Sequence, residues 1–577
     1  MSMESLVDVA QLLYDTEQYH QTKLVSDIPP PNIFELRAMV DRNHNSNYQR
    51  TTNSHQSTRY KSHPYAQKSS YAPSSSHSSL DSDSRQSHSS KLFRNDVKVR
   101  YETPVSWLIR GAKSRSANSW MDHADIIVQE AMPVDYNVLC YSDLVEQLLT
   151  AKKSLAELPK DALIKGRDAA NPYELVGKSV FIDSSAVKLA SLDTQFNFSN
   201  IDQKTQNDYG IEFADFCSEY GGFTEYLLWR KQLMRQPARG WGMTLRGEKD
   251  YMFKKMIVPP GAFPQLDFEA VYGIDGSGDI CNSENIKAFA DHVMKATNGR
   301  GVDLVLADGE LDTMHDGMHL ENHSHQRMLC QILSMFHILK QGGTFLLKCF
   351  DLVTPLSGEL LYILHLHFSK IAILKPLASR PADAERYIIC ENLELSFPSP
   401  LIAHLFECNS KFDLLKSSAD RAYSSRQPEP DTENKAALGL QQVSDILNRD
   451  WVLSDETFVD YIQALNMKMA VKQREAILEL LKYTGQPGVV TPLPFDQIQI
   501  RDQCLNAWKL PNLDAVEKPL ASKREDESRS RSYRQSNHSY YDRDSRYQRQ
   551  DRSRPYRSSN SQYGSGARRE NYDYQHY

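Results

Sequence analysis

Short apolar runs alternate with stretches of helical period between about residues 181 and 395. Residues 302–307 form a near-continuous apolar run that ends in Asp308, as is typical of a strand buried on both faces of a parallel sheet. Other strands are predicted at residues 213–217, 371–374 and 386–390 and around Lys348, with helices at 223–233, 326–339 and 358–368. This alternation predicts a doubly wound α/β sheet, which binds its ligands at the carboxyl ends of the strands.

The regions on either side of this sheet read mainly as helical. Residues 93–180 contain plausible helical pieces at 138–149 and 151–158, and residues 396–515 have a clear 3.6-residue period at 456–465 and 471–483. Residues 1–42 hold two short amphipathic patterns around a run of three prolines. We expect those two helices to dock on the body of the protein or on a partner.

Two long segments are too polar to fold. Residues 43–92 and 523–577 are dominated by Ser, Arg, Tyr and His, so they cannot bury enough apolar surface to offset the entropy of ordering. The chain has a net charge of −7, of which the tail from Lys523 contributes +5 and the remainder −12. An acidic body implies that any RNA site is a local groove. The tail is either a solvated linker or a segment that contacts RNA or protein, since Arg and Tyr both stack on bases.

Cysteine usage and hydropathy narrow the class of protein further. The 8 cysteines form no Cys-x-x-Cys pair, which predicts a reduced, intracellular protein without a zinc framework. Glu4 and Asp8 interrupt the start of the chain, so no signal peptide is expected. No run approaches the roughly 20 apolar residues of a membrane span. We therefore expect a soluble protein without membrane contact.

Four charged residues sit within or beside apolar segments, in the order Lys188, Asp308, Lys348 and Glu385. A buried lysine is costly unless it is paired or has chemistry to do. Two lysines and two carboxylates that converge can lower the pKa of one lysine, so that it works as a base. For a single strand lysine, the alternative is an ordinary surface residue whose amine reaches solvent.

Eight segments that occur in the same order resemble the RrmJ/FtsJ-type ribose 2′-O-methyltransferases, and within them the eukaryotic mRNA cap enzymes. They are residues 170–175, 181–188, 213–226, 242–247, 273–280, 306–309, 348–352 and 379–387. The resemblance implies an α/β, Rossmann-like methyltransferase sheet that uses S-adenosylmethionine. It also implies a catalytic tetrad, with Lys348 as the base, Asp308 and Glu385 setting its protonation, and Lys188 steering the ribose hydroxyl.

The resemblance places the cofactor on the turn after the strand at 213–217. The family has Gly-x-Gly-Gly there, which lets the backbone approach a ligand closely, whereas this chain has Glu219 for the first glycine and Tyr220 for the usual proline. The expected cofactor contacts are Asp183, Cys217, Ser218, Glu219, Tyr220, Gly221, Gly222, Phe223, Asp279 and Ile280. Asp275 competes with Asp279 for the adenosine, and both aspartates can equally be turn formers.

The resemblance also suggests RNA contacts. Arg167 matches a position that contacts the cap, Lys152 and Lys153 match another basic stretch of the family, and Glu385 is expected to lie against the RNA as well. Each of the three cations can equally be a solvated surface charge. His315, His319, His323 and His325 have a spacing that could bind a metal on a helix, but Gly317 weakens a helix, so a polar loop near the RNA entrance is favoured and no metal is expected.

The predicted organisation has five parts: short helices at 1–42, a disordered linker at 43–92, a methyltransferase domain at 93–400, a helical extension at 401–515 and a disordered tail at 523–577. The predicted function is 2′-O-methylation of the first transcribed nucleotide of capped mRNA in the nucleus, with contacts to transcription or RNA-processing machinery through the disordered ends. Two alternatives stay open: a catalytically weakened RNA-binding scaffold, because Glu219 and Tyr220 alter the cofactor turn, and a 2′-O-methyltransferase of other RNA.

Overall fold

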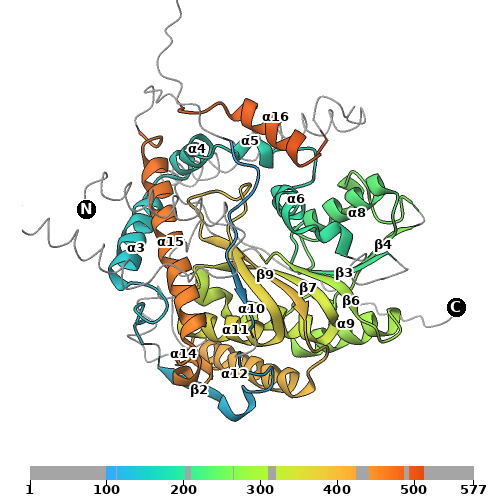
Figure 1. Cartoon of the computed structure of the whole chain (residues 1–577), viewed down its shortest axis with the longest axis vertical. Coiled ribbons are helices and arrows are strands. Elements are labelled where there is room, and N and C mark those ends of the chain that lie inside the picture. The colour runs from blue at the N-terminus through green and yellow to red at the C-terminus, as the bar shows by residue number, and fades with distance from the viewer. Residues whose placement is uncertain are drawn as a thin grey trace, which may run out of the picture. The chain divides into compact units, whose positions relative to one another are not determined.

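The computed structural model describes residues 99–111, 114–130, 132–201, 210–263, 265–309, 320–423, 441–485 and 493–511, with side chains to residue 416 in the sixth range (Figure 1). These residues belong to one compact unit. The predictions for residues 1–42, 43–92 and 523–577 lie outside the described residues.

An eight-stranded mixed sheet forms the centre of the unit, in the order β1-β8-β9-β7-β6-β3-β4-β5. Strands β7, β6, β3, β4 and β5 are parallel, while β9, β8 and β1 are antiparallel to their neighbours. The bounds are β1 Trp107–Ile109, β3 Ile211–Phe216, β4 Ala238–Met243, β5 Leu266–Ala270, β6 Val302–Ala307, β7 Leu339–Phe350, β8 Phe368–Leu374 and β9 Glu385–Leu393. The predicted α/β fold with a largely parallel sheet is therefore confirmed.

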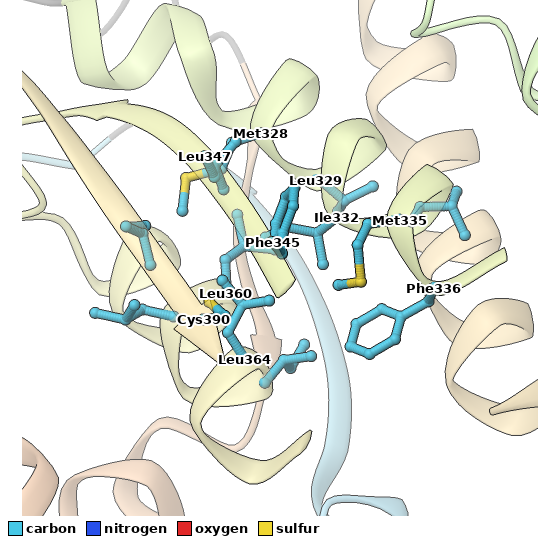
Figure 2. Close-up of a cluster of buried hydrophobic side chains, with 14 of the residues drawn as sticks. Met328, Leu329, Ile332, Met335, Phe336, Phe345, Leu347, Leu360, Leu364 and Cys390 are labelled. Atoms are coloured by element: carbon cyan, nitrogen blue, oxygen red, sulfur yellow. The ribbon is translucent and has the colours of Figure 1, made fainter. Parts of the chain in front are cut away.

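Helices cover both faces of this sheet. One face packs against α6 (Ser184–Phe196) and α8 (Gly222–Met234), and the other against α9 (Ser283–Ala296), α10 (Leu320–Ile338) and α11 (Pro355–His367). Figure 2 shows the second interface, where Leu329 and Ile332 of α10 meet Phe345 of β7 and Leu360 of α11. This second core supports β7, the strand that carries Lys348.

The N-terminal flank contains strands that the sequence did not predict. Strand β1 pairs with β8 at the sheet edge, and β2 (Ala124–Glu130) forms a two-stranded sheet with β10 (Gln441–Leu447). The expectation of a mainly helical 93–180 segment is therefore wrong for these stretches. The two helical pieces expected at 138–158 are one helix, α3 (Ser142–Ala156), which is followed by α4 (Lys160–Ala170) and α5 (Glu174–Gly177).

The C-terminal flank packs on the rest of the unit. Helix α12 (Ser399–Tyr423) contacts α10, α15 (Glu456–Leu481) contacts α3 and α4, and α16 (Gln497–Ala507) contacts α5 (Figure 1). The two periodic stretches predicted after residue 455 belong to the single helix α15. The short helices are α14 (Arg449–Leu453), η1 (Met121–His123), η2 (Phe198–Asn200) and η3 (Phe253–Lys255). Within the described ranges, no helix has the length and apolar character needed to cross a membrane.

Candidate active site

Strand alternation brings three of the four charged residues to one face of the sheet. Lys348 shares its side of β7 with Leu346, which packs in the core under α6 and α8, while Phe345 and Leu347 point to the opposite core. The same two-residue period places Glu385 on the side of Tyr387 in β9, because alternate residues of a strand share a face. Asp308 follows the carboxyl end of β6, beside that of β7.

Helix α6 supplies the fourth residue. Asp183 caps the start of this helix by accepting a hydrogen bond from the Ser185 N–H at 2.6 Å, as is usual at a helix N-terminus. Lys188 lies on α6 and its Nζ donates to Glu385 Oε2 at 2.9 Å. Because α6 packs on one face of the sheet, the Lys188 side chain reaches Glu385 from that face.

The four residues form one connected cluster. Lys348 Nζ lies 3.4 Å from Asp308 Oδ1 and 3.4 Å from Glu385 Oε2, the oxygen that also accepts from Lys188. The exposed fractions of the side chains are 2% for Lys348, 4% for Asp308, 9% for Glu385 and 11% for Lys188. Tyr387 donates its hydroxyl to Asp308 Oδ1 at 2.6 Å, which fixes that carboxylate. The structure therefore brings together all four residues that the sequence singled out.

Lys375 is a fifth charged residue at this site, and the sequence analysis missed it. Its Nζ donates to the backbone oxygens of Asp383 at 2.7 Å and Glu385 at 3.0 Å. Burial lowers the pKa of Lys375 to about 8, although Glu385 and Asp383 act in the opposite direction. The signal was available, because Lys375 follows the apolar strand β8 much as Asp308 follows β6.

The charge of Glu385 depends on the three lysines that surround it. Burial alone would raise the pKa of the Glu385 carboxyl, but Lys188, Lys348 and Lys375, with the Ser379 hydroxyl, hold it well below its usual value. Glu385 is therefore an anion at neutral pH. It is the counter-ion of Lys188, and its Oε2 lies 3.4 Å from Lys348 Nζ.

The turn between β3 and α8 has an unusual backbone. Cys217 has a φ of 59°, Tyr220 of 60° and Gly221 of 89°, so two residues with side chains lie in the left-handed region. The Tyr220 N–H donates to the Lys249 oxygen at 3.0 Å, and the Tyr220 oxygen accepts from the Met252 N–H at 3.0 Å. The segment around residues 249–252 thus holds a turn that Tyr220 would not adopt readily by itself.

Gly222 and Asp183 lie in direct contact at this turn. A β-carbon at Gly222 would come within 2.3 Å of Asp183 Oδ1, so only glycine fits. Asp183 Oδ2 is buried and has no hydrogen-bond partner among the described residues, and burial raises the pKa of this carboxyl to about 6. A buried acceptor beside a glycine turn at the sheet's carboxyl edge fits a ligand with hydrogen-bond donors, such as the amino group of S-adenosylmethionine.

The other residues of the turn have different surroundings. Glu219 accepts from Lys249 Nζ at 2.7 Å, so its negative charge is paired with a cation. Ser218 is buried beneath the turn. Phe223 is also fully buried and packs against Tyr387 with ring centroids 6.3 Å apart. The Phe223 side chain is therefore a core residue, and its expected cofactor contact stays a prediction.

The loop after β5 holds the two candidate aspartates. Asp275 accepts hydrogen bonds from Ser277, Asn282 and Asn285, and the Ser277 bonds lead in lowering its pKa to about 2. Asp279 Oδ1 accepts from the Cys281 N–H at 2.8 Å. Both carboxylates organise the loop, as the turn-forming alternative predicts, while Ile280 is buried in the core.

The three expected RNA contacts differ in exposure. Lys152 is buried in an ion pair with Asp351 at 2.6 Å, so it supports the end of β7 and does not face RNA in this structure. Lys153 is exposed on α3. Arg167 lies 3.5 Å from Asp383 and lines a cavity of about 390 Å³ between α4 and α15. Arg167 and Lys153 thus keep positions from which they can reach a ligand.

The histidine-rich segment does not form a metal site in the described part of the chain. His315 and His319 lie outside the described residues, while His323 and His325 belong to helix α10 and not to a loop. His325 is hydrogen-bonded to Thr354 at 2.9 Å, and burial, with His323, lowers its pKa to about 4. No group of three or more His, Cys, Asp or Glu in the described ranges could hold a metal.

A cavity of about 180 Å³ opens onto the charged cluster. Lys188, Lys348 and Glu385 lie at its base, and Asn171, Tyr173 and Arg380 line its walls. We call it the catalytic cavity. Its polar lining suits the ribose of a nucleotide, and its buried base keeps most water from the lysines.

The family comparison agrees with this geometry. Residues 181–393 match the model of the FtsJ-like methyltransferase family. The chain is 30% identical over 447 residues to cap-specific mRNA (nucleoside-2′-O-)-methyltransferase 1 of Danio rerio, covering 73% of this chain and 50% of that protein. For the Mus musculus and Homo sapiens proteins of the same name the identity is 31%, covering 69% and 66% of this chain and 45% and 43% of theirs.

The chain spans about half the length of the curated relatives it matches. The matched region contains β3 to β9, the glycine turn and all four members of the charged cluster. Residues 181–393 of this chain are therefore an FtsJ-like methyltransferase domain.

Proposed function

We propose that this chain methylates the ribose 2′-hydroxyl of the first transcribed nucleotide of capped mRNA, using S-adenosylmethionine. The observation that carries the proposal is the cluster in which Glu385 Oε2 accepts from Lys188 and lies 3.4 Å from Lys348. Relatives that span most of this chain are named for cap-specific 2′-O-methylation of mRNA, which supports this substrate over other RNA.

Lys348 is the residue that takes the proton from the ribose hydroxyl. Its Nζ is 2% exposed at the base of the catalytic cavity, and Asp308 and Glu385 lie on either side of it. An alcohol has a high pKa, so removing its proton in step with methyl transfer needs a positioned base. Lys188, held by Glu385, orients the hydroxyl toward Lys348 Nζ.

The turn at residues 217–222 and Asp183 would hold the cofactor. S-adenosylmethionine supplies, when bound, a methyl group on a positively charged sulfur. Asp183 Oδ2 would accept from the amino group of the cofactor, and Gly221 and Gly222 would leave room for the backbone to approach it. Glu219 is paired with Lys249, so its charge does not by itself favour the weakened-scaffold alternative.

Transfer of labelled methyl groups to three matched RNAs tests the proposal. The first RNA is capped, the second is capped and already 2′-O-methylated on its first nucleotide, and the third carries a 5′-triphosphate. Only the first should accept the label. Equal labelling of the first and third RNAs would assign the activity to other RNA. A protein that binds capped RNA but neither labels it nor binds S-adenosylmethionine would be the scaffold.

Nuclear localisation and contacts with transcription or RNA-processing machinery follow from this substrate. The capped transcript is made in the nucleus, and the segments expected to recruit partners, residues 1–92 and 523–577, lie outside the described residues. Imaging of the tagged chain in cells tests the compartment. Pull-down with and without residues 523–577 tests the recruitment.

A further inference from the structure

A second cavity lies next to the catalytic cavity. Its lining is basic, whereas the chain outside the tail is acidic. Its volume is about 200 Å³, and it lies between residues 100–106, the loop at residues 375–386 and helix α15. We call it the α15 cavity. It shares Tyr173, Asp383 and Glu385 with the catalytic cavity, so the two are neighbours.

We propose that the α15 cavity binds phosphates of the RNA strand on the downstream side of the methylated nucleotide. This inference rests on the proposed function and adds to it a path for the RNA beyond the cap. The charge of the lining, the position of the cavity and the ring of Tyr173 support it.

The charge of the lining is the first support. Five cations line the cavity, Arg100, Lys375, Arg386, Lys468 and Lys472, against two carboxylates, Asp383 and Glu385. The chain outside its tail is acidic, so a surplus of cations in one cavity is a local departure from the average. A local groove of this kind is what an acidic protein needs to bind a polyanion.

The cations of this cavity lie close enough to affect one another. Burial lowers the pKa of Lys468 to about 8, and Lys472 adds to this effect. Burial and then Arg100 lower the pKa of Lys472. Cations that are held close together repel one another. An anion bound between them offsets this repulsion, so such a cluster favours anion binding. Lys375 and Arg386, by contrast, already donate to backbone oxygens.

The position of Tyr173 supports a nucleic acid ligand in particular. Its ring lines both cavities, and its hydroxyl donates to the Arg100 backbone oxygen at 3.2 Å. Tyr173 therefore links the ribose site to the basic cluster. Aromatic rings next to cations are the usual surface for single-stranded RNA, since bases stack on the ring while cations meet the phosphates.

The expected cap contacts lie elsewhere. Lys153 is on α3, and Arg167 lines the cavity between α4 and α15, which shares Pro381 and Lys472 with the α15 cavity. Neither residue lines the α15 cavity. The strand that leaves the catalytic cavity past Tyr173 is therefore assigned to the nucleotides that follow the target.

Substrate length tests the proposal. The Lys468→Gln/Lys472→Gln double variant removes two charges, and Lys468→Arg/Lys472→Arg keeps them. A third variant, Lys295→Gln/Lys411→Gln, removes two charges from lysines on α9 and α12 and serves as the matched control. All variants keep the full chain, and thermal unfolding checks their folding. The substrates are a capped dinucleotide and a longer capped oligonucleotide of the same 5′ sequence.

The glutamine pair should raise KM for the longer RNA several-fold and leave kcat and the dinucleotide KM unchanged. The slope of log KM against log salt for the longer RNA should fall by roughly one, given about 0.7 per phosphate contact on single strands. The arginine pair and the control should match the wild type. An equal loss with both substrates, or no loss with either, would overturn the proposal.

RNA binding by the α15 cavity can be tested even if the proposed methyltransferase function fails. If the wild type methylates neither RNA, fluorescence anisotropy with the same labelled oligonucleotides still measures binding. The α15 cavity is supported if the glutamine pair weakens binding of the longer RNA alone. It is refuted if all variants bind that RNA as the wild type does.

Discussion

The side-chain amide of Asn466, on helix α15, donates a hydrogen bond to the backbone oxygen of Leu352 at 2.7 Å, just beyond the end of the strand that carries Lys348. Asn466 also donates to the Leu139 oxygen at 2.9 Å and accepts from Arg386 at 2.8 Å. Asp351 and Leu352 have φ angles of 48° and 63°, which residues with side chains rarely adopt. Helix α15 thus holds in place the strained turn that follows β7.

Asn466→Ala should lower the free energy of unfolding by about 2–6 kcal/mol, because it leaves the buried backbone oxygens of Leu352 and Leu139 without this donor at about 1–3 kcal/mol each. It should also lower kcat, because the turn after Lys348 can relax. Gln463→Ala is the control, since Gln463 lies on the same helix and donates to the Val138 oxygen but not to that turn. Equal kcat losses for the two variants would remove the link between Asn466 and the catalytic strand.

Lys348→Met should lower kcat by about 10²–10⁴-fold and leave the dissociation constant of S-adenosylmethionine near that of the wild type, because the lysine acts as a base. Rapid-quench methyl transfer and calorimetry measure the two quantities. Lys340→Met provides the comparison, because Lys340 lies near the other end of β7 and pairs with the buried Asp303. It should lose stability and keep kcat. A Lys348→Met enzyme with near-normal turnover would exclude Lys348 as the base.

Tyr220→Pro should weaken cofactor binding and destabilise the protein, although proline is the residue expected here from the family. Proline fixes φ near −65° and has no N–H, whereas Tyr220 has a φ of 60° and donates to the Lys249 oxygen. The cost should be about 3 kcal/mol or more. Tyr220→Gly, which adopts this φ freely, should be tolerated. Calorimetry and thermal unfolding of both variants measure the difference, and tighter cofactor binding by Tyr220→Pro would contradict this view of the turn.

Asp215→Asn should flatten the pH dependence of stability. Burial raises the pKa of Asp215 from its usual 3.8 to about 8, and the Thr224 hydroxyl donates to it at 2.6 Å. Between these two pKa values the folded protein keeps a proton that the unfolded chain has lost. The stabilisation is therefore complete below about pH 4 and is lost as pH rises through about 8.

Urea unfolding between pH 5 and 7 measures this effect. The wild type should lose about 1.4 kcal/mol per pH unit more than Asp215→Asn, since one proton is linked to folding. Glu225, whose pKa burial raises to about 7, titrates in the same window in both proteins and cancels in the difference. Parallel curves for the two proteins would show that Asp215 is already ionised when folded.

Charged residues within or beside apolar strands could be predicted from the sequence as members of the site. Lys348 stands out because a lysine in an apolar strand needs a partner, and the period of two in β7 and β9 then determines which residues share its face. Asn466 could not be found in this way, because an amide in a helix with a clear 3.6-residue period reads as an ordinary polar position. The pairing of β2 with β10 was missed for a related reason, since more than 300 residues separate the two strands along the chain.

Glu385 is the first residue of β9, which runs antiparallel to β7, and this has a consequence for how such enzymes can diverge. The parallel strands bring their last residues to the site, so the loops after them border it. Strand β9 instead brings its first residue, and the loop before it, residues 375–384, borders both the catalytic cavity and the α15 cavity. The seven residue pairs between β7 and β9 fix Glu385 independently of that loop. Substitutions in residues 376–382 other than Ser379, whose hydroxyl helps to lower the pKa of Glu385, can therefore change RNA binding while the proton-transfer residues stay in place.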